Sequence, residues 1–286
     1  MLMYCLDDSP RFRMIELDEV DSTNSYLKGY RPLHMTDVTL VTAEHQTAGR
    51  GQTGNTWESE RGRNLLFSLL LHPTQLSASE MFVISEAIAL SIREAVITAI
   101  AQPHPARDVS PAPAPRNASE QGVTVKWPND IYVGDCKIAG ILIENELRGQ
   151  HIGRCIVGCG VNVNQATFAF PEATAAANAS ATFHRPPTPV SLLQLTGHET
   201  ERRFVLEDIM EVFMHHYDRI QRGAYEAIHE AYKASLYRRD GVHIFRDSIG
   251  TFEAFIEDVE PSGHLLLRDT GGTLRRYAFK EVAFQS

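Results

Sequence analysis

The chain has 286 residues, of which 43% are hydrophobic and 22% are charged, ordinary values for a globular protein with a sizeable core. Its formal net charge of −9 argues against bulk attraction to DNA or to anionic lipid. No apolar run approaches the roughly 20 residues of a membrane helix, and the N-terminal residues lack the apolar stretch of a signal peptide. Four cysteines without a C-x-x-C pair argue against a disulfide framework. We therefore expect a cytoplasmic protein with reduced thiols and no membrane partner.

The elements expected from the sequence mix helices and strands without a regular strand–helix–strand repeat. A short helix follows the cap residues Asp21 and Ser22 and runs to residue 28. A capping box at 77–80 precedes a helix that ends near residue 100, and helical spacing of apolar side chains returns at 204–232. Strands are expected at 38–43, 65–71, 123–126, 138–146 and 152–163. This mixture favours an α+β fold over a doubly wound sheet.

Two segments rich in proline and alanine, 101–120 and 166–190, interrupt this pattern. Because proline lacks an N–H donor, we interpret them as exposed insertions. Towards the C-terminus, short strands alternate with tight turns at 242–245, 252–259, 264–268 and 274–279. They predict a small all-β barrel or sandwich. We place the boundary near 236–240, which divides the chain into domains at 1–237 and 238–286.

A glycine-rich loop is the first motif with chemical potential. It reads Gly49-Arg50-Gly51-Gln52-Thr53-Gly54 and is followed by Trp57. Such a loop can present consecutive backbone N–H groups to an anion, and Arg50 adds a fixed charge. Trp57 could stack on a flat base. The alternative is a flexible surface turn.

The second motif is Lys126-Trp127-Pro128-Asn129-Asp130, at the end of a strand that Pro128 terminates. Lys126 therefore lies at a strand end, and Lys137 opens the next strand. Two lysines at neighbouring strand ends can hold a polyphosphate as point charges. The alternative is that both are solvated surface lysines.

Alternation in residues 155–164 gives the third motif. The odd positions are Cys, Val, Cys, Val and Val, which predicts a buried face. The even face carries Gly158 and Gly160 and then two asparagines, the first of which is Asn162. A strand gains nothing from two glycines unless another group approaches the backbone, so we interpret this face as the floor of a ligand slot. A helix packed on bare backbone is the alternative.

Asp21-Ser22-Thr23-Asn24 is the fourth motif, and it can be a plain helix cap or can bond a neutral polar ligand. In this order the motifs resemble those of the biotin–protein ligases. The specific matches are Gly-Arg-Gly-x-x-Gly-x-x-Trp, then Lys-Trp-Pro-Asn-Asp followed by Lys137-Ile138-Ala139-Gly140-Ile141-Leu142. The resemblance implies a mixed-sheet catalytic domain of the biotin ligase type, akin to class II synthetases, followed by an SH3-like barrel.

The resemblance also implies an activity. Members of the family use ATP and Mg²⁺ to convert biotin to biotinyl-5′-AMP. They then transfer biotin to one lysine of a biotin carboxyl carrier protein domain of a biotin-dependent carboxylase. A homodimer is compatible with the family.

The roles of single residues follow from the same resemblance. The biotin site would comprise Ser22, Thr23, Asn24, Gln46, Gly49, Arg50, Gly51, Gln52, Lys126, Gly158 and Gly160. The ATP and adenylate site would comprise Arg50, Gln52, Trp57, Lys126, Asn129, Lys137 and Asn162. Lys126 and Arg50 would be catalytic, and no protein ligands for a metal are assignable. Gln52 and Asn55 replace basic residues of many members, so Arg50 would carry more of the phosphate neutralisation.

Three rival functions remain open at this stage. A lipoate or octanoate ligase shares the fold, but Ser22-Thr23-Asn24 and Gln46 favour the polar ring of biotin over a flexible acyl chain. A non-catalytic biotin-binding module is opposed by the presence of both lysines. A biotin-responsive DNA-binding regulator is opposed by the acidic charge. Eighteen residues before Glu19 are also too few for a winged helix. We therefore expect no DNA binding.

Overall fold

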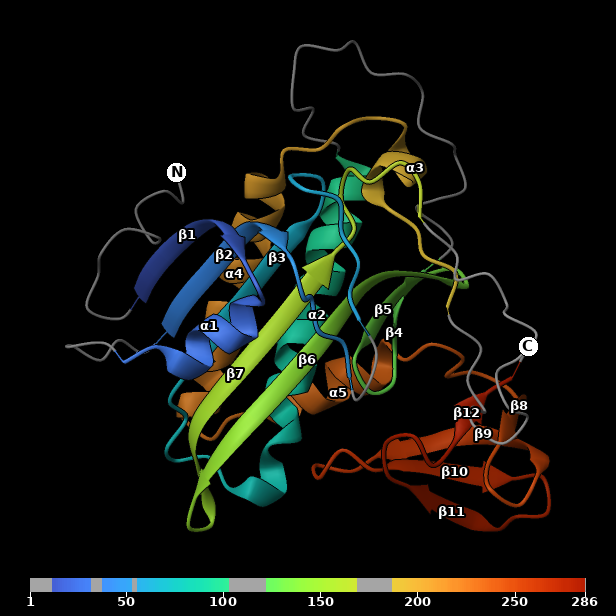
Figure 1. Cartoon of the computed structure of the whole chain (residues 1–286). Helices are drawn as coiled ribbons and strands as arrows, with labels where there is room; N and C mark the ends of the chain where they lie inside the picture. The colour runs from blue at the N-terminus through green and yellow to red at the C-terminus, as the bar shows by residue number, and fades with distance from the viewer. Residues whose placement is uncertain (1–11, 32–37, 53–55, 103–121, 169–186, 286) are drawn as a thin grey trace.

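The computed structural model describes residues 12–31, 38–52, 56–102, 122–168 and 187–285. Cys5, Asn55 and most of the two predicted insertions lie outside these ranges. A seven-stranded sheet forms the larger part of the fold, and the C-terminal residues form a second sheet beside it (Figure 1). None of the described helices is long and apolar enough to cross a membrane.

The large sheet has the strand order β1-β2-β3-β7-β6-β5-β4. Its first two strands are parallel and all other neighbours are antiparallel, which confirms the α+β class with a mixed sheet. Two of its strands, β1 and β5, were not predicted. The strands are β1 (Phe12–Val20), β2 (Val38–Gln46), β3 (Leu65–Leu71), β4 (Val123–Lys126), β5 (Asp130–Val133), β6 (Cys136–Arg148) and β7 (His151–Val161).

Helices cover the two faces of this sheet unequally (Figure 1). On one face α2 (Phe82–Ala101), α4 (Arg202–Gln221) and α5 (Glu226–Ala234) bury the main core, to which β7 contributes its odd-numbered side chains. On the other face α1 (Thr23–Gly29) buries Leu27 in a small second cluster. Burial of that one leucine contributes about 1.5–3 kcal/mol. Beyond α1, this face carries the Trp57 indole, which lies against Gly140 and Gly160.

Three local predictions need correction. Gly223 adopts a positive φ of 69° and ends α4, so the helix predicted at 204–232 is two helices. The expected capping box is only half present, because Ser77 Oγ accepts from Ser79 N at 3.3 Å while Glu80 bonds Tyr225. A 3₁₀ turn, η2 (Ala78–Glu80), therefore precedes α2. The sequence reading also missed α3 (Leu192–Thr196), which does carry a full capping box.

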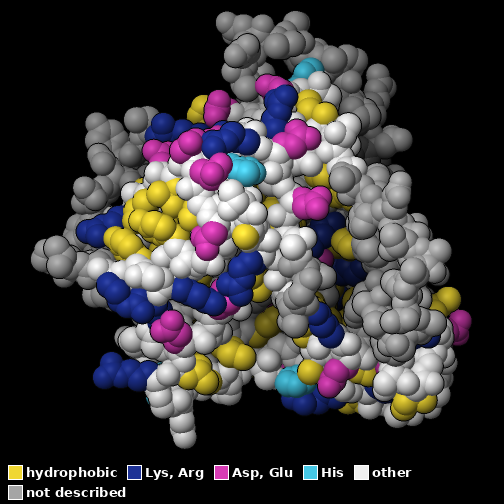
Figure 2. Space-filling view, viewed as in Figure 1, with side chains coloured by type: hydrophobic (Ala, Val, Ile, Leu, Met, Phe, Trp, Pro, Cys, Tyr) yellow, Lys and Arg dark blue, Asp and Glu magenta, His cyan; other side chains and the backbone are white. Residues whose placement is uncertain are grey.

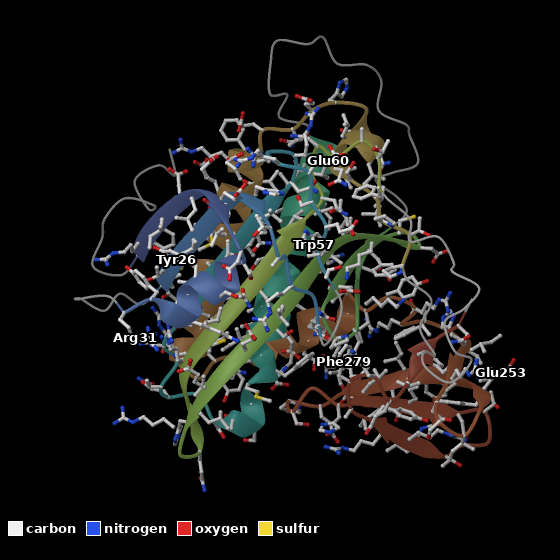
Figure 3. All side chains as sticks on the ribbon, viewed as in Figure 1. Tyr26, Arg31, Trp57, Glu60, Glu253 and Phe279 are labelled. Carbon is white, nitrogen blue, oxygen red and sulfur yellow. The ribbon has the colours of Figure 1, made fainter. Side chains whose placement is uncertain are left out.

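The C-terminal sheet is antiparallel, with the order β11-β10-β9-β8-β12, in accord with the predicted SH3-like domain. Its strands are β8 (His243–Arg246), β9 (Thr251–Val259), β10 (Leu265–Asp269), β11 (Leu274–Tyr277) and the unpredicted β12 (Ala283–Phe284). It contacts the larger part of the fold directly, since Trp127 Nε1 donates to Gly263 O at 3.0 Å. Phe279 lies at this junction (Figure 3).

Candidate functional site

The predicted site lies on the sheet face that carries α1. Cross-strand register places one residue from each of four adjacent strands in a single row: Gly160, Gly140, Asp130 and Lys126. Cross-strand partners point to the same face of a sheet, so this row joins two of the predicted motifs. Lys and Arg side chains gather across the middle of the same face (Figure 2).

A cluster of polar side chains, Thr23, Asn24, Gln46 and Ser68, lies beside Gly158, and we call it the α1 cluster. The Asn24 side chain of α1 fills the space that a Cβ on Gly158 would occupy, at only 2.2 Å from that position. Ser68 Oγ donates to Asn24 Oδ1 at 2.6 Å and also lies 2.7 Å from Thr23 Oγ1. Gln46 Oε1 accepts from both the backbone N–H and the hydroxyl of Thr23, at 2.8 and 3.0 Å. A side chain at position 158 would collide with Asn24, so Gly158 allows α1 to approach the strand. At this glycine the structure therefore agrees with the alternative interpretation, a helix packed on bare backbone.

Gly160 clears a second space, and the Trp57 indole occupies it. A Cβ on Gly160 would lie 2.3 Å from Trp57 Cε2, and one on Gly140 would lie 3.1 Å from Trp57 Cζ3. The indole therefore lies over a patch of two adjacent strands that lacks side chains (Figure 3). Trp57 Nε1 is buried and has no hydrogen-bond partner among the described residues. Lys137 Nζ lies 5.7 Å from the ring centroid.

Glu144 connects the α1 cluster to the glycine-rich loop, a role that the sequence did not predict. Its carboxylate accepts from Asn24 Nδ2 at 3.0 Å, from Lys28 Nζ at 2.7 Å and from Arg50 at 3.0 Å. Burial would raise the pKa of Glu144, but the hydrogen bonds from Lys28 and Asn24 and the charge of Arg50 lower it overall. The carboxylate therefore stays ionised and holds both Asn24 and Arg50.

The two predicted lysines lie on β4 and β6, so they are not on neighbouring strands as expected. The intervening strand β5 was not predicted, and its Asp130 pairs with Lys137 at 2.7 Å. Lys126 is largely enclosed, and burial lowers its pKa, with the Asp130 charge opposing. Neither lysine is the solvated surface residue of the alternative interpretation.

Asn129 and Asn162, both predicted to contact the nucleotide, use their amides within the protein. Asn129 Nδ2 donates to Ile141 O at 2.5 Å, and Asn162 Nδ2 donates to Val190 O at 3.1 Å. Both side chains therefore fasten loops to β6 and to the segment before α3.

The remaining predicted residues belong to the start of α1 and to the loop. Ser22 is the buried N-cap of α1, although its side chain makes no capping hydrogen bond. A Cβ on Gly49 would lie only 2.3 Å from the carbonyl oxygen of Trp57, so only glycine permits this close contact. The contact brings the two ends of the loop together. Gly51 and Gln52 continue the loop, and Gln52 Oε1 is buried without a partner among the described residues. Residues 53–55 lie outside the described part.

The comparison with known proteins begins with the sequence profile of the Biotin/lipoate A/B protein ligase family. It matches residues 17–162, which is more than half of the chain. The chain belongs to this family. The match includes every residue of the predicted site, from Ser22 to Asn162.

Among individual members of the biotin/lipoate ligase family, the biotin–[acetyl-CoA-carboxylase] ligase of Paracoccus denitrificans is 28% identical over 258 residues. That alignment covers 90% of this chain and 94% of the relative. The bifunctional ligase/repressor BirA of Bacillus spizizenii is 26% identical over 270 residues, covering 93% of this chain and 72% of that protein.

A solved structure supports the same fold for this family member. The biotin protein ligase from Aquifex aeolicus in complex with biotin and ATP superimposes with a TM-score of 0.68. The superposition covers 96% of this chain and 98% of the other at 23% identity. The likeness therefore concerns the architecture, including the C-terminal sheet.

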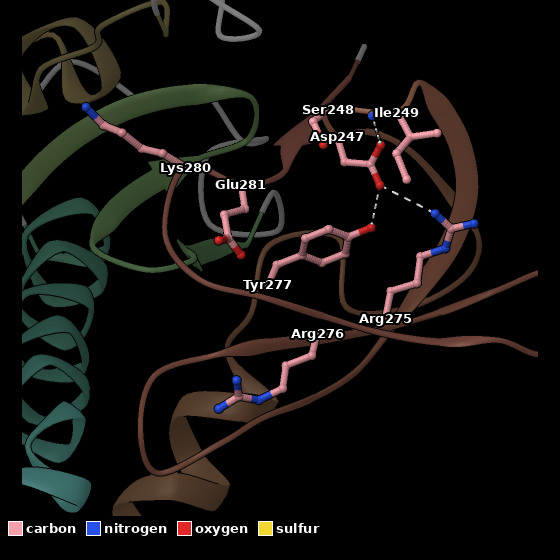
Figure 4. Close-up of a pocket in the computed structure, with 8 residues that line it drawn as sticks. All are labelled: Asp247, Ser248, Ile249, Arg275, Arg276, Tyr277, Lys280 and Glu281. Carbon is pink, nitrogen blue, oxygen red and sulfur yellow. Dashed lines mark hydrogen bonds and ion pairs between the residues drawn. The ribbon is translucent and has the colours of Figure 1, made fainter.

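A cavity of about 430 Å³ lies elsewhere, in the C-terminal sheet (Figure 4). Its two arginines form ion pairs, since Arg275 contacts Asp247 at 3.4 Å and Arg276 contacts Glu260 at 2.8 Å. None of the predicted site residues lines it. Within the described ranges, no group of three or more His, Cys, Asp and Glu side chains could hold a metal ion.

Proposed function

We propose that this chain is a biotin–protein ligase that forms biotinyl-5′-AMP from biotin and ATP and then biotinylates one lysine of a biotin carboxyl carrier protein domain. The observation that carries the proposal is the single sheet face that joins three parts. They are the polar α1 cluster, the Trp57 indole on its glycine patch, and the cations Lys126 and Lys137. The names of the relatives support the same reaction.

The polar groups of the α1 cluster suit the polar ring of biotin. Asn24, Thr23, Ser68 and Gln46 form one connected network of amide and hydroxyl groups at the start of α1. A buried network of this kind rejects a ligand that leaves its members unpaired. An octanoyl chain has no ring, and the dithiolane ring of a lipoyl group has no N–H or C=O group, so the network favours biotin.

In the first half-reaction a biotin carboxylate oxygen attacks the α-phosphorus of ATP. The new O–P bond forms as the bond to the β-phosphate breaks, and pyrophosphate leaves. The protein supplies no nucleophile, but it must bring two anions together and stabilise the charge on the phosphate oxygens. Lys126 and Lys137 supply that charge at the row of residues that crosses the site.

Arg50 adds a third cation that is held ready beside Asn24. Its guanidinium is paired with Glu144, and both side chains are partly exposed. A phosphate that enters next to this pair competes for the guanidinium, because arginine binds phosphate and carboxylate in the same forked geometry. Arg50 thus exchanges partners when the adenylate forms.

Mg²⁺ would arrive with ATP, since it is commonly bound through substrate phosphates and retained water. When bound, it adds charge neutralisation to the departing pyrophosphate. In the second half-reaction the neutral amine of the carrier lysine attacks the acyl carbon. The bond from that carbon to the phosphate oxygen breaks, and AMP leaves.

The deciding experiment is mass spectrometry of a biotin carboxyl carrier domain incubated with the protein, ATP and Mg²⁺. Parallel reactions contain biotin or lipoate, and a carrier whose acceptor lysine is changed to arginine is the control. We expect the mass of one biotinyl group on the unmodified carrier with biotin only. Addition of lipoate would overturn the biotin assignment, and no addition in either reaction would overturn the activity.

A further inference from the structure

The Lys126 ammonium lies among three aromatic rings. Its Nζ is 4.7 Å from the ring centroid of Tyr132, 5.7 Å from that of Tyr237 and 5.4 Å from that of Phe284. Nζ also donates to Tyr132 Oη at 3.2 Å. All three distances are within the range of cation–π attraction. We call these three rings the lysine cage.

Two rings of the lysine cage do not come from the large sheet. Tyr237 follows α5 at the entrance to the C-terminal sheet, and Phe284 belongs to β12, its last strand. The Phe284 ring lies 6.0 Å from Tyr237 and 5.1 Å from Phe245, which is fully buried in the C-terminal sheet. A continuous series of rings therefore links Lys126 to the core of the second sheet.

Polar contacts fix the position of this junction. Tyr237 Oη donates to Asp135 at 2.6 Å, and the Arg238 guanidinium donates to the carbonyl of Gln285. Arg238 also adopts a positive φ of 56°, which is unfavourable for a residue with a side chain. Such conformations persist where the surroundings enforce them. The end of β12 is thus held beside Tyr237 and over Lys126.

We propose that the C-terminal sheet acts in catalysis by positioning Lys126 for adenylation through Phe284 and Tyr237. This inference rests on the proposed function. A lysine side chain has four rotatable bonds, and the cage limits them before the substrates arrive, so less order must be gained at the transition state. Phe284 and Tyr237 are positioning residues, because they act through Lys126.

The test compares Phe284→Leu with Phe284→Tyr, which restores a ring, and with Phe279→Leu, which removes a junction ring outside the lysine cage. Single-turnover experiments measure biotinyl-AMP formation and, separately, transfer from supplied biotinyl-AMP to a carrier domain. We expect Phe284→Leu to slow adenylation by roughly 2- to 30-fold, the range of one cation–π contact. Transfer should be unchanged, and Phe284→Tyr and Phe279→Leu should adenylate at the wild-type rate.

An NMR measurement tests the cage without reference to activity. The ε-methylene resonance of Lys126, assigned by its absence in Lys126→Met, should be shifted upfield by ring currents in the wild type and less so in Phe284→Leu. An unshifted wild-type resonance, or equal slowing of both half-reactions, would overturn the inference. Faster adenylation by Phe284→Leu would also overturn it, by showing that the cage withholds the lysine. Failure of the proposed function is distinct, since the wild type would then form no biotinyl-AMP.

Discussion

Replacement of Gly160 by alanine tests most directly whether Trp57 stacks on adenine. The added Cβ would lie 2.3 Å from Trp57 Cε2 and under 3 Å from two further indole atoms. The indole must therefore retreat by roughly 1.2 Å or more to regain a carbon–carbon separation of about 3.5 Å. The strand itself tolerates the change, because alanine is favoured over glycine in a strand interior by about 0.5–1 kcal/mol.

The consequence should appear in nucleotide binding. Stacking of a base on an aromatic side chain contributes about 1–3 kcal/mol, so a displaced indole should weaken ATP binding by roughly 5- to 150-fold. Titration calorimetry with ATP measures this, while thermal unfolding checks the fold. Gly250→Ala is the matched control, since nothing lies within 4 Å of its would-be Cβ.

A double-mutant cycle completes this test. In a Trp57→Ala background, Gly160→Ala should not weaken ATP binding further, because the two changes act on the same contact. Wild-type ATP affinity in a folded Gly160→Ala protein would refute the assignment of adenine to Trp57. Additive losses would show that Gly160 acts on the ligand by another route.

Three further predictions concern charged groups. Lys126→Ala should slow biotinyl-AMP formation by about 10²–10³-fold and should affect transfer from supplied biotinyl-AMP much less. Single-turnover rates of the two half-reactions measure this, and equal slowing of both would show that the lysine is structural. Glu144→Ala should weaken biotin binding roughly tenfold, because Asn24 loses a charged acceptor, and calorimetry that finds unchanged affinity contradicts this role. The buried Glu86 contacts His229 at 2.5 Å; burial raises the pKa of Glu86, and the hydrogen bond to Glu86 raises the pKa of His229. Both groups bind a proton more tightly in the folded state, so each stabilises the fold most when it is protonated. The contribution of Glu86 is complete below its ordinary pKa of about 4.5 and that of His229 below about 6.5, and each is lost as pH rises through the raised pKa of the folded state. Melting temperatures across this range should show a weaker fall for Glu86→Gln, and identical curves would be evidence against the linkage.

Sequence alone predicted those features that local periodicity determines. The alternation at 155–164 gave both the buried face of β7 and the glycine-cleared face opposite. By contrast, β1 is an edge strand that carries acidic side chains, including Glu16 and Asp18. Its parallel pairing with β2 joins two segments that are not adjacent in the sequence. Edge strands carry a weak apolar pattern because only part of their surface is buried.

The parts of the site that escaped prediction depend on contacts distant in sequence. Glu144 occurs in a polar stretch of β6, and only the fold brings Asn24, Lys28 and Arg50 to its carboxylate. Phe284 forms part of a two-residue strand that pairs with β8, too short to show any period. A glutamate or a phenylalanine does not by itself predict these roles, because the roles depend on where the fold places the side chain.

Asn24 and the Trp57 indole pack against two glycines of one strand, β7, and this sets the distance between them. Residues two apart on a strand are separated by about 6.6–6.8 Å along its axis. Gly158 and Gly160 are such a pair, so the spacing between Asn24 and the indole is fixed by backbone geometry. Under the proposed function, a ligand that contacts both Asn24 and the indole must therefore carry its polar ring and its flat base at a separation that matches this spacing. The backbone of β7 would then contribute to selection by ligand length.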